Sequence, residues 1–569
     1  MMFDYVIVGG GSAGCVLASR LSENPRVQVA LIEAGPDTPP ENIPESIYGE
    51  GYLPDYFNPT RYWTRLKVYR SAIGNRSMDD LVREEEPVRY EQARVMGGGS
   101  SVNAQIALRG LPSDYDEWES MGASGWGWDG CLPYFKRLER DMDFEGEYHN
   151  KDGPLPIRRV FHTDWADFAR AFRDALIENG LPYSDDCHAT FEDGCFPYPK
   201  NNVYGRRVSA AAAYLTNSVR QRGNLRIFSD TEVTGLAFEG NRAKGVKILS
   251  KGKSDEISGN EIIISAGALH SPAILMRAGI GPADHLRDVG IEVRTDRPGV
   301  GSNLQDHPLV GLGVHLRPEA RLQSHIKNPF LMYTRFSSRM EGCPKGDMKM
   351  SLGNRFDQSA VGHQFAAIRV GPDKAYSRGY VRLRTAGPDD EPIVMFNLLS
   401  DPRDMQRMVD GIKFAHKILT SRQVSQTVYS VFAGAYTEWI RRLSSPAPHM
   451  RAITKMGSML LDLGKITRTP LMMMAEPRQF AMAKMIRDDK VIEEFARATV
   501  LGNWHAIGTC RMGYADDRGA VVDASGCVIG VAGLRVVDAS IMPSVPCANT
   551  NLTTLMLAEK MSDQIAGKR

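Results

Sequence analysis

The chain is 569 residues long, which exceeds a single typical domain and favours two closely packed domains. Its 42% hydrophobic and 24% charged residues are ordinary for a globular protein, and they exclude a fibrous or disordered chain. The net charge of +1 gives no electrostatic reason to expect nucleic acid or an acidic membrane surface as a partner.

The eight cysteines are scattered, with no CxxC pair and no spacing typical of metal ligands. We therefore expect reduced, mostly buried thiols and no metal. An apolar run begins at Phe3 and leaves no room for a signal peptide ahead of it. No run approaches the roughly 18 apolar residues of a membrane-spanning helix. These features predict a cytoplasmic protein without a membrane span.

The first apolar run, residues 3–8, leads directly into a glycine-rich turn. Gly9, Gly11 and Gly14 have GxGxxG spacing, and residues 15–21 have the apolar spacing of a helix. Gly9 suits a tight turn, Gly11 lets a pyrophosphate approach the backbone, and Gly14 permits close helix–strand packing. The N-terminus of the helix would present free N–H groups to phosphate.

A second apolar run, residues 27–32, ends in Glu33, where a ribose-binding carboxylate is expected. A lone GxGxxG is weak, but strand, glycines, helix, strand and acid in this order predict a dinucleotide site. A tight turn that binds nothing is the alternative. A second turn rich in Gly and Ser, residues 94–103, suits another close approach of backbone to a cofactor, although a plain flexible loop has the same composition.

Further strand patterns lie at residues 224–229, 232–237, 245–249 and 261–265, and the last leads into a turn and a helix. From Pro308 onward the sequence pattern predicts strands with little helix between them, at 309–316, 348–356, 365–370, 379–384 and 393–396. These indicate an antiparallel sheet in a second domain. A helix is expected over 402–419, and a last strand, turn and helix over 533–561.

The stretch 432–485 is rich in methionine and carries Trp439, the Arg441-Arg442 pair and the run Met472–Met474. Ordinary core filling explains such methionines. The functional alternative is an adaptable wall at the entrance of a substrate cavity.

Six separated segments resemble the glucose–methanol–choline (GMC) family of flavin oxidoreductases. They occur in the family's order and span nearly the whole chain: GGGSAG at 9–14 with Glu33, RVMGGGSSVN at 94–103, GALHSPAILMRAGIGP at 267–282, GVGSNLQDHP at 299–308, NWHAIGTCRMG at 503–513 and GLRVVDASIMPSVPCANTN at 533–551. Within the family, the likeness is greatest to members that oxidise furanic alcohols, and next to those that oxidise aryl alcohols.

The resemblance implies an α/β fold (α+β overall), with a discontinuous Rossmann-like FAD domain and an inserted substrate domain built on an antiparallel sheet. The expected FAD-binding parts are residues 1–155, 222–308 and 495–569. The expected substrate-domain parts are residues 156–221 and 309–494.

The same resemblance assigns the cofactor, FAD, to a set of residues. The glycines of the first turn would hold the pyrophosphate, Glu33 the ribose and the Val233 backbone the adenine, while Asp538 and Ala539 would approach from the C-terminal side. The full expected set is Gly9, Gly11, Ser12, Ala13, Gly14, Glu33, Gly98, Gly99, Ser100, Asn103, Val233, Asp538, Ala539 and Thr550. Some family members bind the flavin covalently through a His where this chain has Val102, so we expect non-covalent FAD.

For catalysis the resemblance indicates His505 and Asn549. A flavin takes a hydride from the alcohol carbon at N5, and a histidine suits the removal of the hydroxyl proton. An asparagine amide can hold the oxygen as negative charge develops. A turn role for Asn549, or catalysis by Asn551 instead, are the alternatives. His270 and His307 also lie in motifs, where turn-stabilising roles suffice.

Three further residues are expected in the substrate pocket. Trp504 would supply an aromatic wall, although a core role is nearly as good an explanation. Ala104 follows the second glycine-rich turn. Arg369, if it points inward, would pair with a carboxylate or polar substituent of the substrate.

These features predict FAD-dependent oxidation of a primary alcohol, aromatic or furanic, to the aldehyde. The partners would be a small alcohol and an electron acceptor, either oxygen, giving hydrogen peroxide, or another acceptor. The alternatives are a non-redox FAD-containing lyase of the hydroxynitrile lyase type, an aliphatic alcohol or choline-like dehydrogenase and, least favoured, a flavin-binding sensor.

Overall fold

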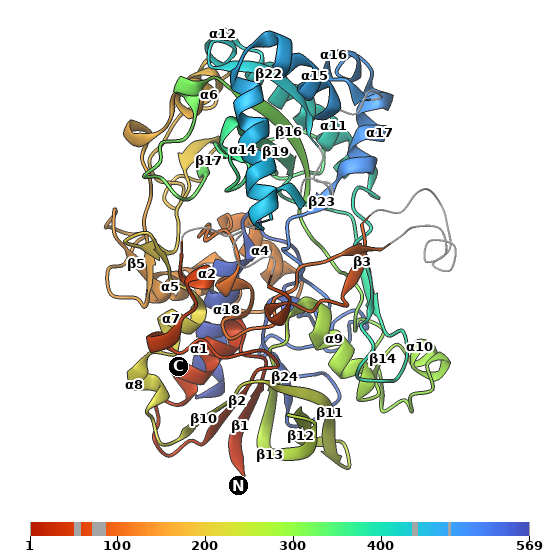
Figure 1. The fold of residues 1–569 in the computed structure, drawn as a ribbon. Helices are drawn as coiled ribbons and strands as arrows, with labels where there is room; N and C mark the ends of the chain where they lie inside the picture. Colours follow the sequence, from red (N-terminus) through yellow and green to blue (C-terminus); the bar gives the residue numbers. More distant parts are fainter. Residues whose placement is uncertain are drawn as a thin grey trace.

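The computed structural model describes residues 2–49, 58–70, 87–434, 442–445, 447–475 and 480–567. Two seven-stranded sheets lie at opposite ends of the molecule (Figure 1). Trp439 and Arg441, and the side chains of Met473 and Met474, lie outside the described residues.

The lower sheet in Figure 1 has the order β10-β2-β1-β13-β12-β11, with β24 paired to β13. Its strands are β1 (Phe3–Val8), β2 (Val29–Ile32), β10 (Leu225–Phe228), β11 (Thr231–Glu239), β12 (Arg242–Ser250), β13 (Lys253–Ile264) and β24 (Leu534–Val536). Strands β10, β2, β1, β13 and β24 pair in parallel. Strand β13 is long enough to pair antiparallel with β12 through its first half. The carboxyl ends of the parallel strands therefore meet at one edge, where α/β folds bind ligands.

Three helices begin at the cavity described below: α1 (Ser12–Leu21), α9 (Gly267–Arg277) and α18 (Thr550–Ile565). α1 and α18 pack side by side, although they come from opposite ends of the chain (Figure 1). α18 is buried on nearly all its faces, so it lies in the core rather than at the surface. Arg20 of α1 forms an ion pair of 2.8 Å with the buried Glu559 of α18.

The upper sheet has the order β22-β16-β19-β18-β17-β7, with β23 paired to β16, and its pairs are antiparallel. Its strands are β7 (Gly194–Pro197), β16 (Pro308–Leu316), β17 (Phe330–Phe336), β18 (Met348–Gly353), β19 (Phe365–Pro372), β22 (Val428–Gly434) and β23 (Leu501–Gly502). The expected antiparallel sheet and the fold class are confirmed. The five domain boundaries stay a prediction.

Two of the strands expected in this sheet lie elsewhere. β20 (Tyr380–Arg382) and β21 (Ile393–Met395) form a separate four-stranded sheet with β3 (Lys67–Tyr69) and β4 (Val88–Arg89). β21 pairs in parallel with β3, a partner far away in the sequence, which local periodicity does not reveal.

The other described elements surround these sheets. The helices are α2 (Glu45–Tyr48), α4 (Pro112–Ser120), α5 (Trp128–Leu138), α6 (Asp167–Glu178), α7 (Ala210–Tyr214), α8 (Asn217–Arg220), α10 (Ala283–Asp288), α11 (Pro402–Leu419), α12 (Arg422–Ser425), α14 (Pro448–Asp462), α15 (Lys465–Ala475), α16 (Met482–Met485) and α17 (Asp489–Thr499). The short strands are β5 (Glu139–Asp141), β6 (Leu155–Ile157), β8 (Asn202–Val203), β9 (Arg206–Arg207), β14 (Ile280–Gly281) and β15 (Thr295–Asp296). Among the described helices, none is both long and apolar enough to cross a bilayer.

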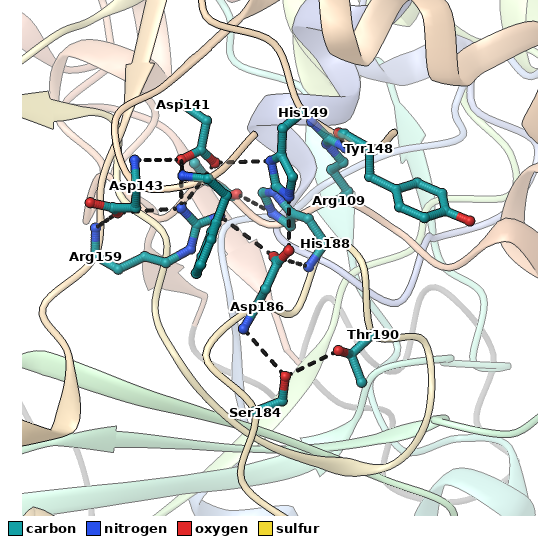
Figure 2. A network of polar contacts seen from close by, with 12 residues as sticks. Arg109, Asp141, Asp143, Tyr148, His149, Arg159, Ser184, Asp186, His188 and Thr190 are labelled. Atoms are coloured by element: carbon teal, nitrogen blue, oxygen red, sulfur yellow. Dashed lines mark hydrogen bonds and ion pairs between the residues drawn. The ribbon is translucent and has the colours of Figure 1, made fainter. Parts of the chain in front are cut away.

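A buried ionic network joins the loops around β5 and β6 to the loop before β7. His149 lies between carboxylates, and its Nδ1 is 2.9 Å from Glu139. The same Nδ1 is 3.1 Å from Asp141, and Nε2 is 2.8 Å from Asp186 (Figure 2). Burial opposes its charged form, but hydrogen bonds to carboxylates raise the His149 pKa to about 10. Protonated His149 has no lone pair for a metal, and Arg109 and Arg159 pair with the same cluster of acids. We assign this network to holding the loops together.

Candidate active site

A cavity of about 970 Å³ extends from the carboxyl edge of the lower sheet to the upper sheet. That volume is at the upper end of typical ligand sites, which span about 300–1,000 Å³. Most of the expected site residues line it: Gly9, Gly11, Ser12, Ala13, Glu33, Gly98, Gly99, Asn103, Ala104, Val233, Arg369, Trp504, His505, Asp538, Ala539, Asn549 and Thr550. Gly14 and Ser100 are not among the lining residues.

The two glycine-rich turns meet at the start of α1. Gly9 has a φ of +105°, and a Cβ there would lie 2.5 Å from the Ser265 carbonyl oxygen. A Cβ on Gly98 would lie 2.8 Å from the Gly11 Cα, so the second turn packs directly against the first. The Cβ directions of Gly11 and Gly99 are open, with nothing nearer than 3.9 Å. A bare backbone beside a helix N-terminus with no acidic residue in its first turn fits a pyrophosphate.

Gly14 and Ser100 support the two turns on the side away from the cavity. A Cβ on Gly14 would lie 1.9 Å from the Gly9 carbonyl oxygen, so glycine permits the close packing of α1 that the spacing predicts. The Ser100 hydroxyl donates to the Gly97 carbonyl oxygen at 2.5 Å and accepts from the Ala210 N–H at 2.9 Å. Ser100 therefore fixes the turn, and its expected contact with the cofactor stays a prediction.

Two buried carboxylates organise the cofactor end of the cavity. Glu33 accepts from the backbone N–H groups of Gly10 (2.8 Å) and Gly35 (2.9 Å), and burial raises its pKa. Asp538 accepts from the Gly267 N–H at 2.8 Å and the Ser271 hydroxyl at 2.6 Å, and burial raises its pKa too. Asp538 thus ties the C-terminal segment to α9.

His505 is buried beside the cavity and is held from three directions. Its backbone N–H donates to Asp306 at 3.0 Å, its Nδ1 lies 2.7 Å from the Nδ1 of His307, and its Nε2 lies 3.1 Å from the Nδ2 of Asn549. The preceding residue, Trp504, has a φ of +55°, a conformation rare for bulky side chains. Such backbone strain is common where a reactive side chain must be aimed.

The hydrogen-bond chain indicates which nitrogen of His505 can accept a proton. The Nε2 of His307 lies 3.0 Å from the Pro546 carbonyl oxygen, which can only accept, so this Nε2 carries the hydrogen. Burial lowers the pKa of His307 well below its usual value, so its ring is neutral and its Nδ1 accepts. His505 therefore donates from Nδ1, and its Nε2 accepts from the Asn549 amide, which leaves Nε2 as the nitrogen that can take a proton once a hydroxyl group replaces that contact.

The expected role of His307 in stabilising a turn is thus incomplete, because it contacts the candidate base directly. Sequence reasoning also missed Lys349, which lines the cavity from β18 and pairs with Asp373 at 2.5 Å. Burial lowers the pKa of His505 well below its usual value, and the charges near it, that of Lys349 included, lower it further. The imidazole of His505 is therefore neutral at physiological pH.

Asp306 holds together the two segments that carry His307 and His505. Its Oδ1 accepts from the backbone N–H groups of His307 (2.7 Å), Asn503 (3.1 Å) and His505 (3.0 Å). Burial raises the Asp306 pKa to about 7 even though these three donors favour its ionised form. No candidate role had been assigned to it, although its position in the NLQDHP motif was a signal.

The structure distinguishes between the two candidate asparagines. Asn549 is the N-cap of α18, yet its side chain makes no capping bond and faces His505 instead. Asn551 accepts from the Ser12 hydroxyl at 2.8 Å and so connects α18 to α1. Of these two, Asn549 is the one whose amide lies within hydrogen-bond distance of His505; the Asn503 amide also approaches that ring, 3.2 Å from its Nδ1.

The substrate side of the cavity contains the three expected pocket residues. Trp504 is 44% exposed, and its Nε1 donates to Glu91 at 3.2 Å, which places it at the rim rather than in the core. The Arg369 guanidinium lies 5.2 Å over the Phe330 ring. Within the described part of the chain, no carboxylate lies at ion-pair distance from Arg369.

Comparisons with known proteins agree with this geometry. The family model described as GMC oxidoreductase matches residues 3–309, and its C-terminal counterpart matches residues 375–558. The chain belongs to the GMC oxidoreductase family. GMC members are FAD-dependent, and the family places this chain among the alcohol oxidases and dehydrogenases.

Individual relatives cover almost the whole chain. It is 41% identical to a 5-(hydroxymethyl)furfural oxidase of Methylovorus sp. (strain MP688), over 99% of this chain and 98% of the relative. It is 32% identical to the mitochondrial choline dehydrogenase of Homo sapiens, over 100% of this chain and 90% of the relative. Among solved structures, pyridoxine 4-oxidase from Mesorbium loti matches with a TM-score of 0.81 and 28% identity, covering 100% of both chains.

Proposed function

We propose that the protein oxidises primary alcohols with an aromatic or furanic ring to aldehydes. The observation that carries the proposal is the pairing of His505 Nε2 with Asn549 Nδ2, at 3.1 Å, on the cavity wall. A neutral base and an amide donor converge there on one point, where a hydroxyl oxygen would be held. The 41% identity to a 5-(hydroxymethyl)furfural oxidase supports the furanic class.

Bound FAD would supply the hydride acceptor. His505 takes the hydroxyl proton at Nε2, and Asn549 donates to the oxygen as negative charge develops. The imidazolium formed at His505 keeps its Nδ1–H on the Nδ1 of His307, whose own Nε2–H remains on the Pro546 carbonyl. This arrangement holds the ring in one orientation before and after proton transfer, so the proton acceptor needs no reorganisation.

We propose that the expected residues hold FAD without a covalent bond. The turn glycines would leave room for the pyrophosphate, and Glu33 and Val233, which both line the cavity, would hold the ribose and the adenine. Val102, the position of the covalent His in other members, lines the cavity and has no nucleophilic atom.

Acid or heat precipitation is therefore expected to release intact FAD into the supernatant. The absorbance of the supernatant and of the pellet measures the partition directly. Flavin that stays with the precipitated protein would contradict non-covalent binding.

Arg369 is proposed to recognise a carboxylate or polar substituent on the far side of the substrate ring. Arg369 lines the cavity, and no carboxylate of the described residues lies at ion-pair distance from it. A hydrogen bond between its guanidinium and a charged substituent would contribute about 1.5–3 kcal/mol to binding. The same charge disfavours the quaternary ammonium of choline, which argues against the choline-like alternative.

Arg369→Met is expected to raise KM for a carboxylate-bearing aryl alcohol about 10–100-fold, the equivalent of that hydrogen bond. KM for the unsubstituted alcohol should change little, and Arg369→Lys should keep part of the discrimination. Equal effects on the two alcohols would show that Arg369 only packs against Phe330.

The stretch 432–485 is proposed to form part of the entrance wall. Its cavity-lining residues come from β22, α14, α15 and the segment before α14; they are Phe432, Gly434, Leu443, Ser444, Ile453, Thr454, Gly457, Leu461, Leu471 and Met472. We test this wall at Met472, which lines the cavity, and not at Met473, whose side chain is outside the described residues.

Leu471→Ala and Met472→Ala are expected to raise kcat/KM for bulky alcohols relative to small ones, because they widen the entrance. Steady-state kinetics with a matched pair of alcohols measures the ratio. If the ratio of kcat/KM for bulky and small alcohols is unchanged in both variants, the stretch contributes only to packing and does not select the substrate.

A panel of alcohols scored in parallel with oxygen and with a dye acceptor tests the proposed function and its electron acceptor. Peroxide formation identifies an oxidase, and dye reduction alone identifies a dehydrogenase. A cytoplasmic location is proposed as well, and it mildly favours a dehydrogenase because peroxide would otherwise form inside the cell.

A further inference from the structure

Helices α14 and α15 form a hairpin with two apolar sides. One side lines the cavity, through residues that include Thr454, Leu461 and Leu471. The opposite side of α14 continues onto the first turn of α15 and is open to solvent, although it is also apolar. Its exposed members are Met456 (60%), Met459 (57%), Leu463 (73%) and Ile466 (91%). A helix that is apolar on both sides is normally covered on both.

Basic side chains border this exposed stripe. Arg451, Lys455 and Lys465 are all exposed on the same two helices. The acid of the hairpin, Asp462, is already paired with Arg321 at 2.6 Å. The net charge of +1 for the whole chain therefore conceals a local cationic cluster around an apolar stripe.

We propose that this docking face, Met456, Met459, Leu463 and Ile466 with Arg451, Lys455 and Lys465, binds the surface of an anionic lipid bilayer. An amphipathic helix with apolar side chains bordered by Lys and Arg lies in the plane of the interface, with its apolar residues among the acyl chains. Anionic headgroups supply the countercharge that the hairpin lacks.

A second copy of the chain is a poorer occupant of the docking face. A two-fold dimer would bury two copies of the docking face in one interface, and the docking face has no acid to pair with Arg451, Lys455 and Lys465. An anionic surface satisfies both the apolar stripe and the charges.

Docking would bring the mouth of the cavity to the bilayer. Ile453 belongs to both sides of the hairpin, since it is 46% exposed and also lines the cavity. Apolar alcohols dissolved in the membrane would then reach the cavity along the hairpin without crossing water. Docking itself does not depend on the proposed reaction, whereas this route to the cavity rests on it.

Co-sedimentation of the FAD-loaded protein with lipid vesicles tests the proposal. Wild-type protein should pellet with vesicles of equimolar phosphatidylcholine and phosphatidylserine, and not with phosphatidylcholine alone. Arg451→Gln with Lys455→Gln should weaken binding about 25-fold, because each basic side chain at an anionic surface contributes a factor of about five. Met456→Glu with Met459→Glu and Ile466→Glu should weaken it by at least as much.

The matched control is Met142→Glu with Ile177→Glu, which changes side chains that are 49% and 45% exposed outside the hairpin. It should bind as wild type does. Turnover of a water-soluble alcohol should be the same in the triple variant, since its three positions do not line the cavity.

Three results would overturn the proposal. One is wild-type protein that stays in the supernatant with the mixed vesicles. Another is a triple variant that binds them like wild type. The third is self-association in sedimentation velocity that the triple variant abolishes, which would make a second copy the occupant.

Discussion

His505→Ala is expected to bind FAD normally and to lose reduction of the flavin by alcohol by about 10²–10⁴-fold, the usual effect of removing a positioned general base. The structure gives the reason, because Nε2 is the nitrogen of His505 that carries no hydrogen, and it lies beside Asn549 on the cavity wall. Stopped-flow mixing with alcohol in the absence of oxygen measures the rate directly.

The pH dependence gives a second readout of the same change. The folded pKa of His505 lies below its usual value of about 6.5, so the neutral base persists as the pH falls through that value. Wild-type reduction should therefore stay level from pH 8 to below about pH 6.5. The variant should instead speed up as the pH rises, since hydroxide can take the proton that the imidazole took.

His416→Ala is a suitable control, because His416 lies on α11 and does not line the cavity. It should reduce its flavin at the wild-type rate. A His505→Ala protein that does the same would transfer the role of base to another histidine.

Asn549→Ala is expected to lower the same rate by about 10²–10³-fold, the effect of losing one donor to a developing oxyanion. Combining it with His505→Ala should cost less than the product of the two factors, because both side chains act on one oxygen. The three rates come from the same stopped-flow experiment.

Asn551→Ala separates this role from simple packing of α18. It removes the bond to Ser12 on α1, so it should weaken FAD retention more than it slows reduction. Should Asn551→Ala prove the slower of the two variants, the assignment of Asn549 would be wrong.

The cofactor half of the molecule was largely predictable from sequence. The glycine spacing, the apolar runs and Glu33 are local in the chain, and local backbone geometry is what such patterns encode. Gly14 is an example. The spacing predicts close packing of the helix there, and in the structure a Cβ added at Gly14 would clash with the Gly9 carbonyl oxygen.

The surroundings of His505 were not predictable in the same way. His307 meets His505 because residues near the start of β16 pair with the segment after β23, with Gln305 bridged to Ile507. Lys349 reaches the same place from β18, through pairing across the upper sheet. Such contacts depend on tertiary pairing between distant segments, and no periodicity within one segment reports them.

Anaerobic mixing of the wild-type protein with a furanic or aryl alcohol tests the central claim most directly. Alcohol oxidation predicts that the flavin absorbance bleaches and that one aldehyde appears for each flavin reduced. An unchanged flavin spectrum across the alcohol panel, together with cyanide release from a hydroxynitrile, would contradict it and establish a lyase instead.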